Sequence, residues 1–177
     1  MADRKYSLDV LAALAVAVAT VGLTLAFYRL VGSYEEGSVA VGISGWHYGT
    51  GLIGWAFVIA AAVGTWMRAG PDGWSGPGRV IGFLTTGAAC AAVATAVVAI
   101  VRVPDGEAVA AAAYQHISRD ELLGIATEAA GWMPTGSHVE LGLGPFLLLV
   151  SALLVLGAGA GSLRGALGRG GADTRSA

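Results

Sequence analysis

Four side chains of this sequence could together bind a metal ion: His47, His116, His138 and Glu140. Imidazole nitrogens and carboxylate oxygens are ligands with which proteins hold zinc or copper. The three histidines are far apart in the sequence, and no HxxxH or HExxH pair is present, so the fold would have to bring separate segments together. The simpler interpretation, which we favour, is that these side chains form hydrogen bonds in the loops where they lie.

Patterns typical of enzymes are missing from the sequence. It has no G-x-S-x-G nucleophile elbow, because Gly42-Ile43-Ser44-Gly45 is one residue short, and it has no C-x-x-C pair or phosphate-binding loop. Its single cysteine, Cys90, excludes an intrachain disulfide and a cysteine-based zinc cluster. We therefore expect a protein that is not an enzyme and that carries no cofactor.

The composition indicates a membrane protein. The chain has 177 residues, of which 55% are hydrophobic and 12% are charged, whereas soluble domains contain about 25% charged residues. The formal net charge of -2 gives no basis for nucleic-acid binding, which depends on clustered lysine and arginine. The expected partner is therefore the lipid bilayer, together with another membrane protein.

Four apolar stretches predict an all-α integral membrane protein whose single domain is a four-helix transmembrane bundle. They cover about residues 10–30, 48–67, 80–101 and 145–163, and a helix of about 20 residues crosses the hydrocarbon core. None has a charge near its centre. Ala17-Val18-Ala19 resembles a signal-peptide cleavage site, but the apolar run continues to Phe27, so we expect the first stretch to be retained as a span.

The distribution of basic residues predicts the orientation. One side would carry seven Lys and Arg residues in the N-terminal segment, in the loop 68–79 and in a disordered tail at 165–177: Arg4, Lys5, Arg68, Arg79, Arg164, Arg169 and Arg175. The opposite side would carry three: Arg29, Arg102 and Arg119. Because basic loops stay in the cytoplasm, we expect a multi-pass protein of the plasma membrane with both termini cytoplasmic.

Two outer loops, 31–47 and 102–144, would contain most of the polar residues. Alternating apolar residues favour a short strand or extended loop in the first. In the second, an Ala-rich run over 107–116 and a capping box at Ser118–Glu121 predict a small helical extracytoplasmic cap over the mouth of the bundle. Residues 139–143 are predicted to be extended, with the regular fourth helix beginning at Pro145.

Small residues at four-residue spacing predict close helix packing, since helices in lipid associate where their backbones can approach. The steps are Gly22 and Ala26; Ala60 and Gly64; Gly87, Ala91, Thr95 and Ala99; and Gly157, Gly161 and Gly165. Internal packing is the favoured interpretation, ahead of homodimerisation. Cys90 is likewise expected to serve as a small packing residue.

Charged residues at the span ends have structural interpretations. Asp9 is expected to pair with Arg4 or Lys5 or with headgroups, and Arg29 to reach water or to pair with an outer carboxylate such as Glu140. No ionisable residue lies at membrane depth, which argues against transport and against a haem held by intramembrane histidines.

These observations predict a non-enzymatic accessory or interaction subunit that recognises its partner through the outer cap. Two alternatives stay open at this point. One is a metal- or cofactor-binding membrane protein that uses the histidines and Glu140. The other is a lipid or quinone binder with a groove lined by small residues between its helices.

Overall fold

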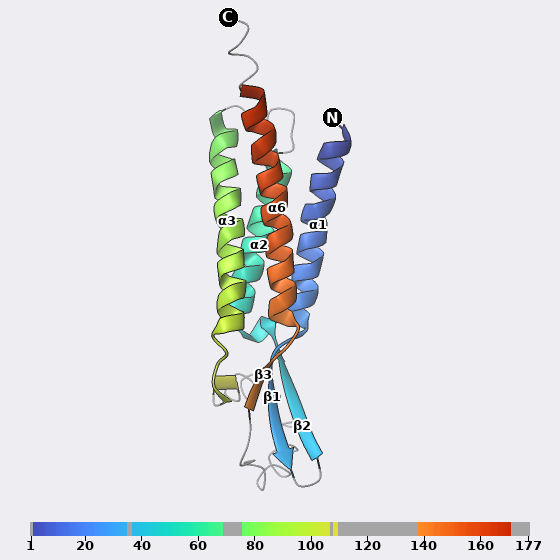
Figure 1. Cartoon of the computed structure of the whole chain (residues 1–177), viewed down its shortest axis with the longest axis vertical. Coiled ribbons are helices and arrows are strands. Elements are labelled where there is room, and N and C mark those ends of the chain that lie inside the picture. Colours follow the sequence, from blue (N-terminus) through green and yellow to red (C-terminus); the bar gives the residue numbers. More distant parts are fainter. Residues whose placement is uncertain (1, 35–36, 69–75, 107, 110–137, 171–177) are drawn as a thin grey trace, which may run out of the picture.

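The computed structural model describes residues 2–34, 37–68, 76–106, 108–109 and 138–170. Its four helices are α1 (Ala2–Thr24), α2 (Gly49–Arg68), α3 (Gly76–Val101) and α6 (Gly144–Gly170), and its strands are β1 (Ala26–Tyr34), β2 (Gly37–Ser44) and β3 (His138–Leu141), with a 3-10 turn η1 (Gly45–His47) before α2. The helices lie side by side, and the sheet projects from one end of the bundle (Figure 1). The start of α1 and the end of α6 lie at the opposite end.

Three of the helices are long and apolar enough to cross a membrane. The stretches are Ser7–Thr24, Gly49–Met67 and Val80–Val101, with mean hydropathies of 1.9, 1.6 and 2.1. In α6 the apolar stretch Gly144–Ala160 is shorter. The prediction of long apolar helices is therefore confirmed for three of the four stretches. The all-α class is wrong, because the mostly helical structure also contains a three-stranded sheet.

The first predicted span is wrong at its outer end. Helix α1 ends at Thr24 and β1 begins at Ala26, so residues 26–30 form a strand and not the last turns of a helix. Aromatic and β-branched residues are enriched in strands, and this segment contains Phe27 and Tyr28. Hydropathy could not reveal the change, because the apolar run continues through it.

The sheet has three antiparallel strands in the order β2-β1-β3. β1 and β2 form a hairpin that pairs Ala26 with Ser44 at its base, and β3 pairs Leu141 with Tyr28. The predictions of extended structure in the first outer loop and before the fourth helix are both confirmed. Helix α6 begins at Gly144, one residue before Pro145, which stands at a first-turn position that suits proline.

Other loop predictions have mixed outcomes. Gly106, Ala108 and Val109 are helical, whereas the remainder of the predicted helical cap, residues 110–137, lies outside the described residues. Helix α6 continues to Gly170, so the prediction of disorder is wrong for residues 165–170, where alanine and leucine favour helix. Residues 171–177 lie outside the described part of the chain.

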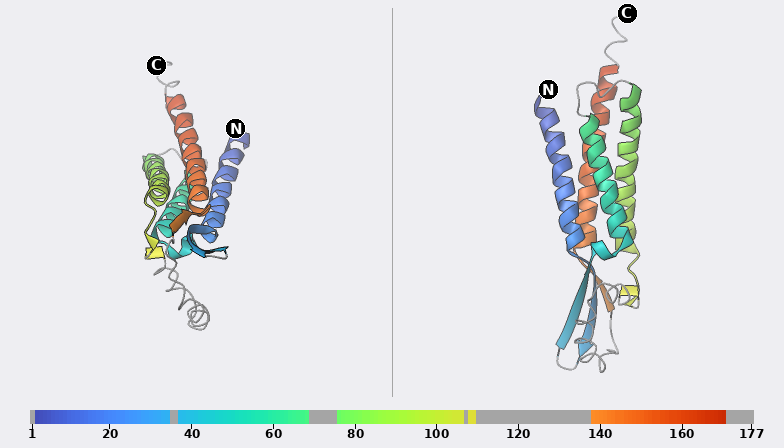
Figure 2. Two further views of the ribbon diagram at one scale, coloured as in Figure 1. Left: turned by 60° about the horizontal axis from the view of Figure 1, so that its bottom comes forward. Right: turned by 180° about the vertical axis from the view of Figure 1, so that it is seen from behind.

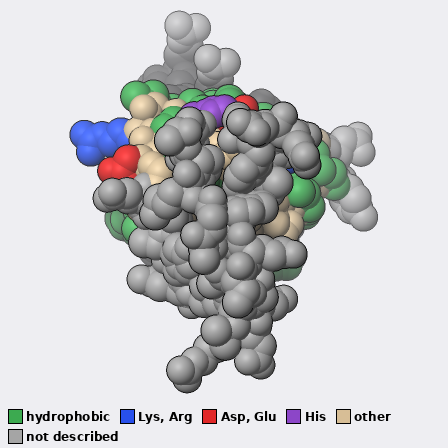
Figure 3. Space-filling model, turned by 90° about the horizontal axis from the view of Figure 1, so that it is seen from below, with side chains coloured by type: hydrophobic (Ala, Val, Ile, Leu, Met, Phe, Trp, Pro, Cys, Tyr) green, Lys and Arg blue, Asp and Glu red, His purple; other side chains and the backbone are tan. Residues whose placement is uncertain are grey.

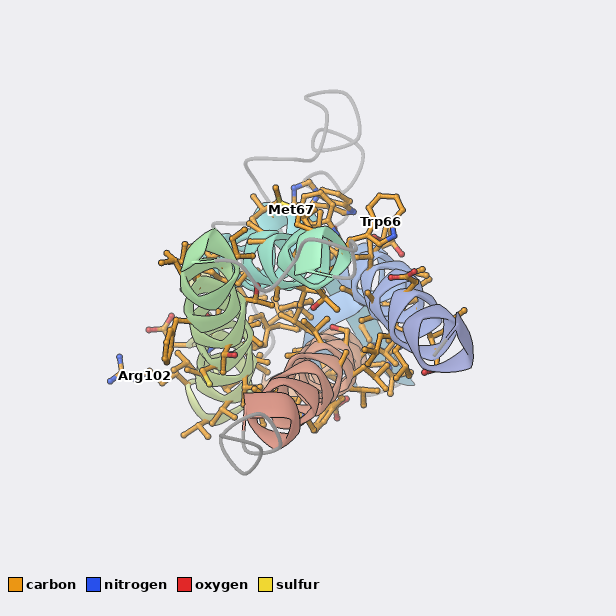
Figure 4. The ribbon with its side chains drawn as sticks, turned by 90° about the horizontal axis from the view of Figure 1, so that it is seen from above. Trp66, Met67 and Arg102 are labelled. Carbon is orange, nitrogen blue, oxygen red and sulfur yellow. The ribbon has the colours of Figure 1, made fainter. Side chains whose placement is uncertain are left out.

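The bundle has a core built largely from alanine. α1 packs against α2 and α6, and α3 packs against the same two helices, so that α1 and α3 lie across from each other (Figures 2 and 4). Fully buried side chains include Ala15, Ala19, Ala61, Ala89, Ala92, Ala96 and Ala152, with Leu23, Val58, Leu148 and Val155 between them. Small side chains let the helix backbones approach, which is how helices gain packing contacts when their surroundings are apolar.

The tightest helix contact joins α1 and α6 near the sheet. A Cβ atom placed on Gly22 would lie 2.9 Å from Leu147 Cβ and 3.1 Å from the Gly144 carbonyl oxygen. A Cβ atom on Gly144 would lie 2.7 Å from the Gly22 carbonyl oxygen and would overlap the ring of Phe27. The two backbones therefore meet with room for hydrogen atoms only, which confirms Gly22 as a packing position.

Other predicted packing positions have mixed outcomes. Gly64 and Ala99 are confirmed, because a Cβ atom on Gly64 would lie 3.2 Å from Thr85 Cβ and Ala99 is buried, whereas Gly87, Gly157 and Cys90 are wrong. Cβ atoms on Gly87 or Gly157 would meet nothing within 4 Å, and Cys90 is exposed. On α3 the buried stripe runs through Thr85, Ala89, Ala92, Ala96 and Ala99, and it shares only Ala99 with the predicted step. Spacing alone could not choose between these stripes, because α3 carries small residues on several faces.

Five hydroxyl groups of the helices donate hydrogen bonds within their own helix. Thr20, Thr65, Thr85 and Thr95 each donate to the backbone carbonyl four residues earlier, at 2.7–2.9 Å, and Ser151 donates to the carbonyl of Leu148 at 2.7 Å. Such bonds stay within one helix and link no helices together. These five hydroxyls therefore form no polar path along the bundle.

The contact between Gly22 and Gly144 predicts unequal effects for two identical substitutions. Gly144→Ala should lower the unfolding free energy by about 1–3 kcal/mol, as overpacked sites do. Gly157→Ala adds the same methyl group where there is space, and it should leave stability unchanged or raise it by about 0.5–1 kcal/mol. Thermal unfolding of the purified proteins in detergent measures the difference, and equal melting temperatures would contradict the contact.

Candidate functional site

Two of the four candidate metal ligands lie together on β3. His138 Nε2 is 3.2 Å from Glu140 Oε1, and both side chains are exposed, at 57% and 50%. Residues two apart on a strand face the same way, which explains why His138 and Glu140 meet while Val139 and Leu141 turn to the opposite, half-buried face. The pair is a solvent-exposed hydrogen bond that becomes an ion pair when the imidazole is protonated.

His47 does not join this pair in the part of the chain that the structure describes. His47 lies in η1, at the boundary between sheet and bundle, and is exposed. His116 lies outside the described residues. No group of three or more histidine, cysteine, aspartate or glutamate side chains suited to a metal occurs within the ranges that the structure describes. The metal site at His47, His116, His138 and Glu140 stays a prediction.

The sheet presents two different faces. Register places Arg29 directly opposite Glu140, and Val31 opposite His138, so these charged side chains share one face. Tyr28 and Leu30 lie on the other face, opposite Leu141 and Val139. In the end-on view of Figure 3 a histidine side chain lies next to an acidic one, and a basic side chain lies apart from them beside another acidic side chain.

A buried tyrosine connects the sheet to the bundle through a hydrogen bond. Tyr28 in β1 is 2% exposed, and its hydroxyl donates a hydrogen bond of 2.8 Å to the carbonyl oxygen of Ala99. Ala99 lies in the last turn of α3, where carbonyl groups lack partners within the helix. The phenol therefore caps α3 from a strand 71 residues away in the sequence.

Tyr48 and Thr50 bring polar atoms without partners to the same junction. The rings of Tyr28 and Tyr48 pack edge to face with centroids 4.7 Å apart. The Tyr48 hydroxyl and the Thr50 hydroxyl are buried and find no hydrogen-bond partner among the described residues. Asp105 accepts a hydrogen bond of 2.8 Å from the Ala108 amide and so caps the helical residues that follow it.

The environment of the two tyrosines shifts their ionisation. Burial raises the pKa of the Tyr28 phenol above its ordinary value of 10.0. Burial also raises the pKa of Tyr48, and the charges of ionised Tyr28 and of Asp105 raise it further. Both phenols are therefore neutral hydrogen-bonding groups over the whole physiological pH range.

Two tryptophans complete this end of the bundle. Trp46 in η1 packs against Trp55 in α2 with ring centroids 5.6 Å apart. The Trp55 indole nitrogen donates a hydrogen bond of 3.1 Å to the Thr20 hydroxyl, which links α2 to α1. Sequence analysis predicted neither these tryptophan contacts nor the capping role of Tyr28, for which no local sequence signal exists.

Comparisons with protein-family models, with curated proteins and with solved structures give no match for this chain.

Removal of each phenol hydroxyl should have opposite consequences. Tyr28→Phe leaves the buried Ala99 carbonyl without its donor and should lower the unfolding free energy by about 1–3 kcal/mol. Tyr48→Phe removes a buried hydroxyl that has no partner, so stability should stay the same or rise by up to about 1 kcal/mol. Chemical unfolding monitored by circular dichroism tests the pair, and a larger loss for Tyr48→Phe than for Tyr28→Phe would contradict this account.

The raised pKa values also predict a loss of stability in alkali. Below pH 10.0 both phenols are protonated in the folded and unfolded chains, so neither weakens the fold. As the pH rises above 10.0, the unfolded chain releases these protons first, and stability falls until the raised pKa values are passed. Unfolding measured from pH 8 to about 12 should show this decline, and the double variant Tyr28→Phe/Tyr48→Phe should show a shallower one.

Proposed function

We propose that this chain is a non-enzymatic accessory subunit of the plasma membrane, with four spanning helices and both ends in the cytoplasm. The distribution of apolar side chains supports insertion. Only 28–33% of the residues in the three apolar stretches are buried inside the protein, and large side chains such as Phe83, Leu84 and Val101 are 68–75% exposed. An apolar surface of this extent is stable when lipid, and not water, surrounds it.

α6 serves as the fourth span in this proposal. It packs against α1, α2 and α3 along the bundle, and its 27 residues give a length of about 40 Å. A helix that lies beside three spanning helices over that distance crosses the same layer, although its described apolar stretch is the shortest.

The arrangement of the helix ends supports the proposed orientation. Arg68 ends α2, Arg79 lies in the first turn of α3, and Arg164 and Arg169 lie near the end of α6. All of these positions are at the end of the bundle away from the sheet (Figure 1). Arg29 and Arg102 lie at the sheet end, where Arg102 points away from the helices (Figure 4). The positive-inside rule then favours a sheet outside the cell.

The projecting sheet is the main observation that supports an interaction role. β2 and β3 are its outer strands, and in the part of the chain that the structure describes neither pairs with a further strand on its other side. An outer strand offers main-chain N–H and C=O groups to an extended segment of another protein. The charged face with Arg29, His138 and Glu140 would fix the register of such a segment.

A lysine on the outer strand tests this role. Ala40 is exposed on β2, and Ala40→Lys should lower recovery of the partner about tenfold, because lysine on an edge strand opposes strand addition. The control Val103→Lys places the same side chain at an exposed position outside the sheet and should leave recovery unchanged.

The measurement is affinity purification of the full chain in detergent at native abundance, followed by quantitative mass spectrometry. Recovery of the wild-type protein alone would contradict the proposal. Equal recovery of the same partner by both lysine variants would keep an interaction but would exclude β2 as its site.

A further inference from the structure

A groove of about 710 Å³ lies between α1 and α2, toward the bundle end that is remote from the sheet. Its lining is almost entirely apolar and includes Ala13 and Val16 of α1 and Ile59 and Val63 of α2. The exceptions are at one end, where Asp9 of α1 and Trp66 of α2 both line it. Trp66 lies on the side of α2 next to α1, as Figure 4 shows.

The carboxylate at the end of the groove lacks a partner for one of its oxygens. Asp9 Oδ1 is buried and forms no hydrogen bond with a described residue, while Asp9 as a whole is partly exposed and lines the groove. A buried carboxylate oxygen without a hydrogen bond is costly, and a cationic donor compensates that cost best. Because Asp9 is partly exposed and lines the groove, the charge of its carboxylate favours a ligand that brings a positive charge and N–H groups to this end.

Trp66 also favours a cationic ligand. Its side chain is 69% exposed although it lines the groove. The face of an indole ring attracts cations, and ammonium groups are recognised in this way. An anionic side chain and an indole at one end of an apolar groove form a site for an ammonium group.

The remainder of the groove fits a hydrocarbon chain. From Asp9 to Val16 helix α1 rises by about 10 Å, and over this length the lining residues of both helices are alanine, valine and isoleucine. Such a lining offers no polar partner to a ligand. The ligand is therefore amphiphilic, with its charge at Asp9 and its apolar part extending toward Val16 and Ile59.

We propose that this groove binds a membrane lipid with a primary ammonium headgroup, held by Asp9 and Trp66, with an acyl chain packed between α1 and α2. The inference rests on the membrane insertion proposed above, which places Asp9 near the headgroups of the cytoplasmic leaflet. A choline headgroup is a poorer ligand because it has no N–H group for Asp9. An anionic headgroup is disfavoured by charge.

The test uses the full chain in detergent, titrated with three phospholipids that have identical acyl chains and carry ethanolamine, choline or glycerol headgroups. Native mass spectrometry counts the lipids that stay bound. Asp9→Asn keeps the shape of the side chain and removes its charge. Ala13→Leu fills the groove, and Ala94→Leu makes the same change at an exposed alanine of α3, which does not line it.

The wild-type chain should retain the ethanolamine lipid at least about fivefold better than either of the others, and Ala94→Leu should behave identically. Asp9→Asn should reduce this preference to less than about twofold, because the charge that selects the ammonium group is gone. Ala13→Leu should reduce retention of all three lipids.

Equal retention of the three lipids by the wild type would overturn the proposal. Unchanged selectivity in Asp9→Asn would overturn it as well, because Asp9 would then be paired with another group of the chain, such as Lys5. Extraction of the chain from membranes by alkaline carbonate tests insertion separately. A chain that resists extraction but shows no headgroup preference would overturn the proposed lipid binding in the groove and leave the proposed function intact.

Discussion

The close approach of α1 and α6 at Gly22 and Gly144 is the constraint on which the sheet end depends. A methyl group at Gly144 would overlap the Phe27 ring and crowd the Gly22 carbonyl. β1 begins shortly after α1 ends, and β3 ends shortly before α6 begins. The contact between these helices therefore brings the two strands side by side, and the ladder that pairs Tyr28 with Leu141 continues the same antiparallel arrangement.

The helices could be predicted because length and hydropathy define them, and because Pro145 marks where the last one begins. The end of α1 could not, since residues on both sides of Thr24 are apolar and the choice of strand depends on pairing with β2 and β3. The packing face of α3 was also beyond prediction. Its many alanines offer several stripes, and only contacts with α2 and α6 select the one that includes Thr85 and Ala96.

Side-chain partners were predictable only where they are local. His138 and Glu140 meet because a strand repeats every two residues. The bond from Tyr28 to the Ala99 carbonyl spans 71 residues, and neither residue type signals it. The groove at Asp9 and Trp66 likewise depends on how the antiparallel helices α1 and α2 are aligned, because the start of α1 must lie beside the end of α2. Sequence analysis could offer a groove between helices as an alternative, but it could place neither its position nor its charged end.

The attachment of the sheet has a mechanical consequence. Leu25 is the single residue between α1 and β1. The Gly142 amide donates a hydrogen bond of 2.9 Å to the Phe27 carbonyl, and the Tyr28 hydroxyl donates one to the Ala99 carbonyl at the end of α3. The short connection and the two hydrogen bonds together fix the orientation of the strands relative to the helices. A sideways force on the strand tips would therefore be transmitted to α1, α3 and α6 through these contacts.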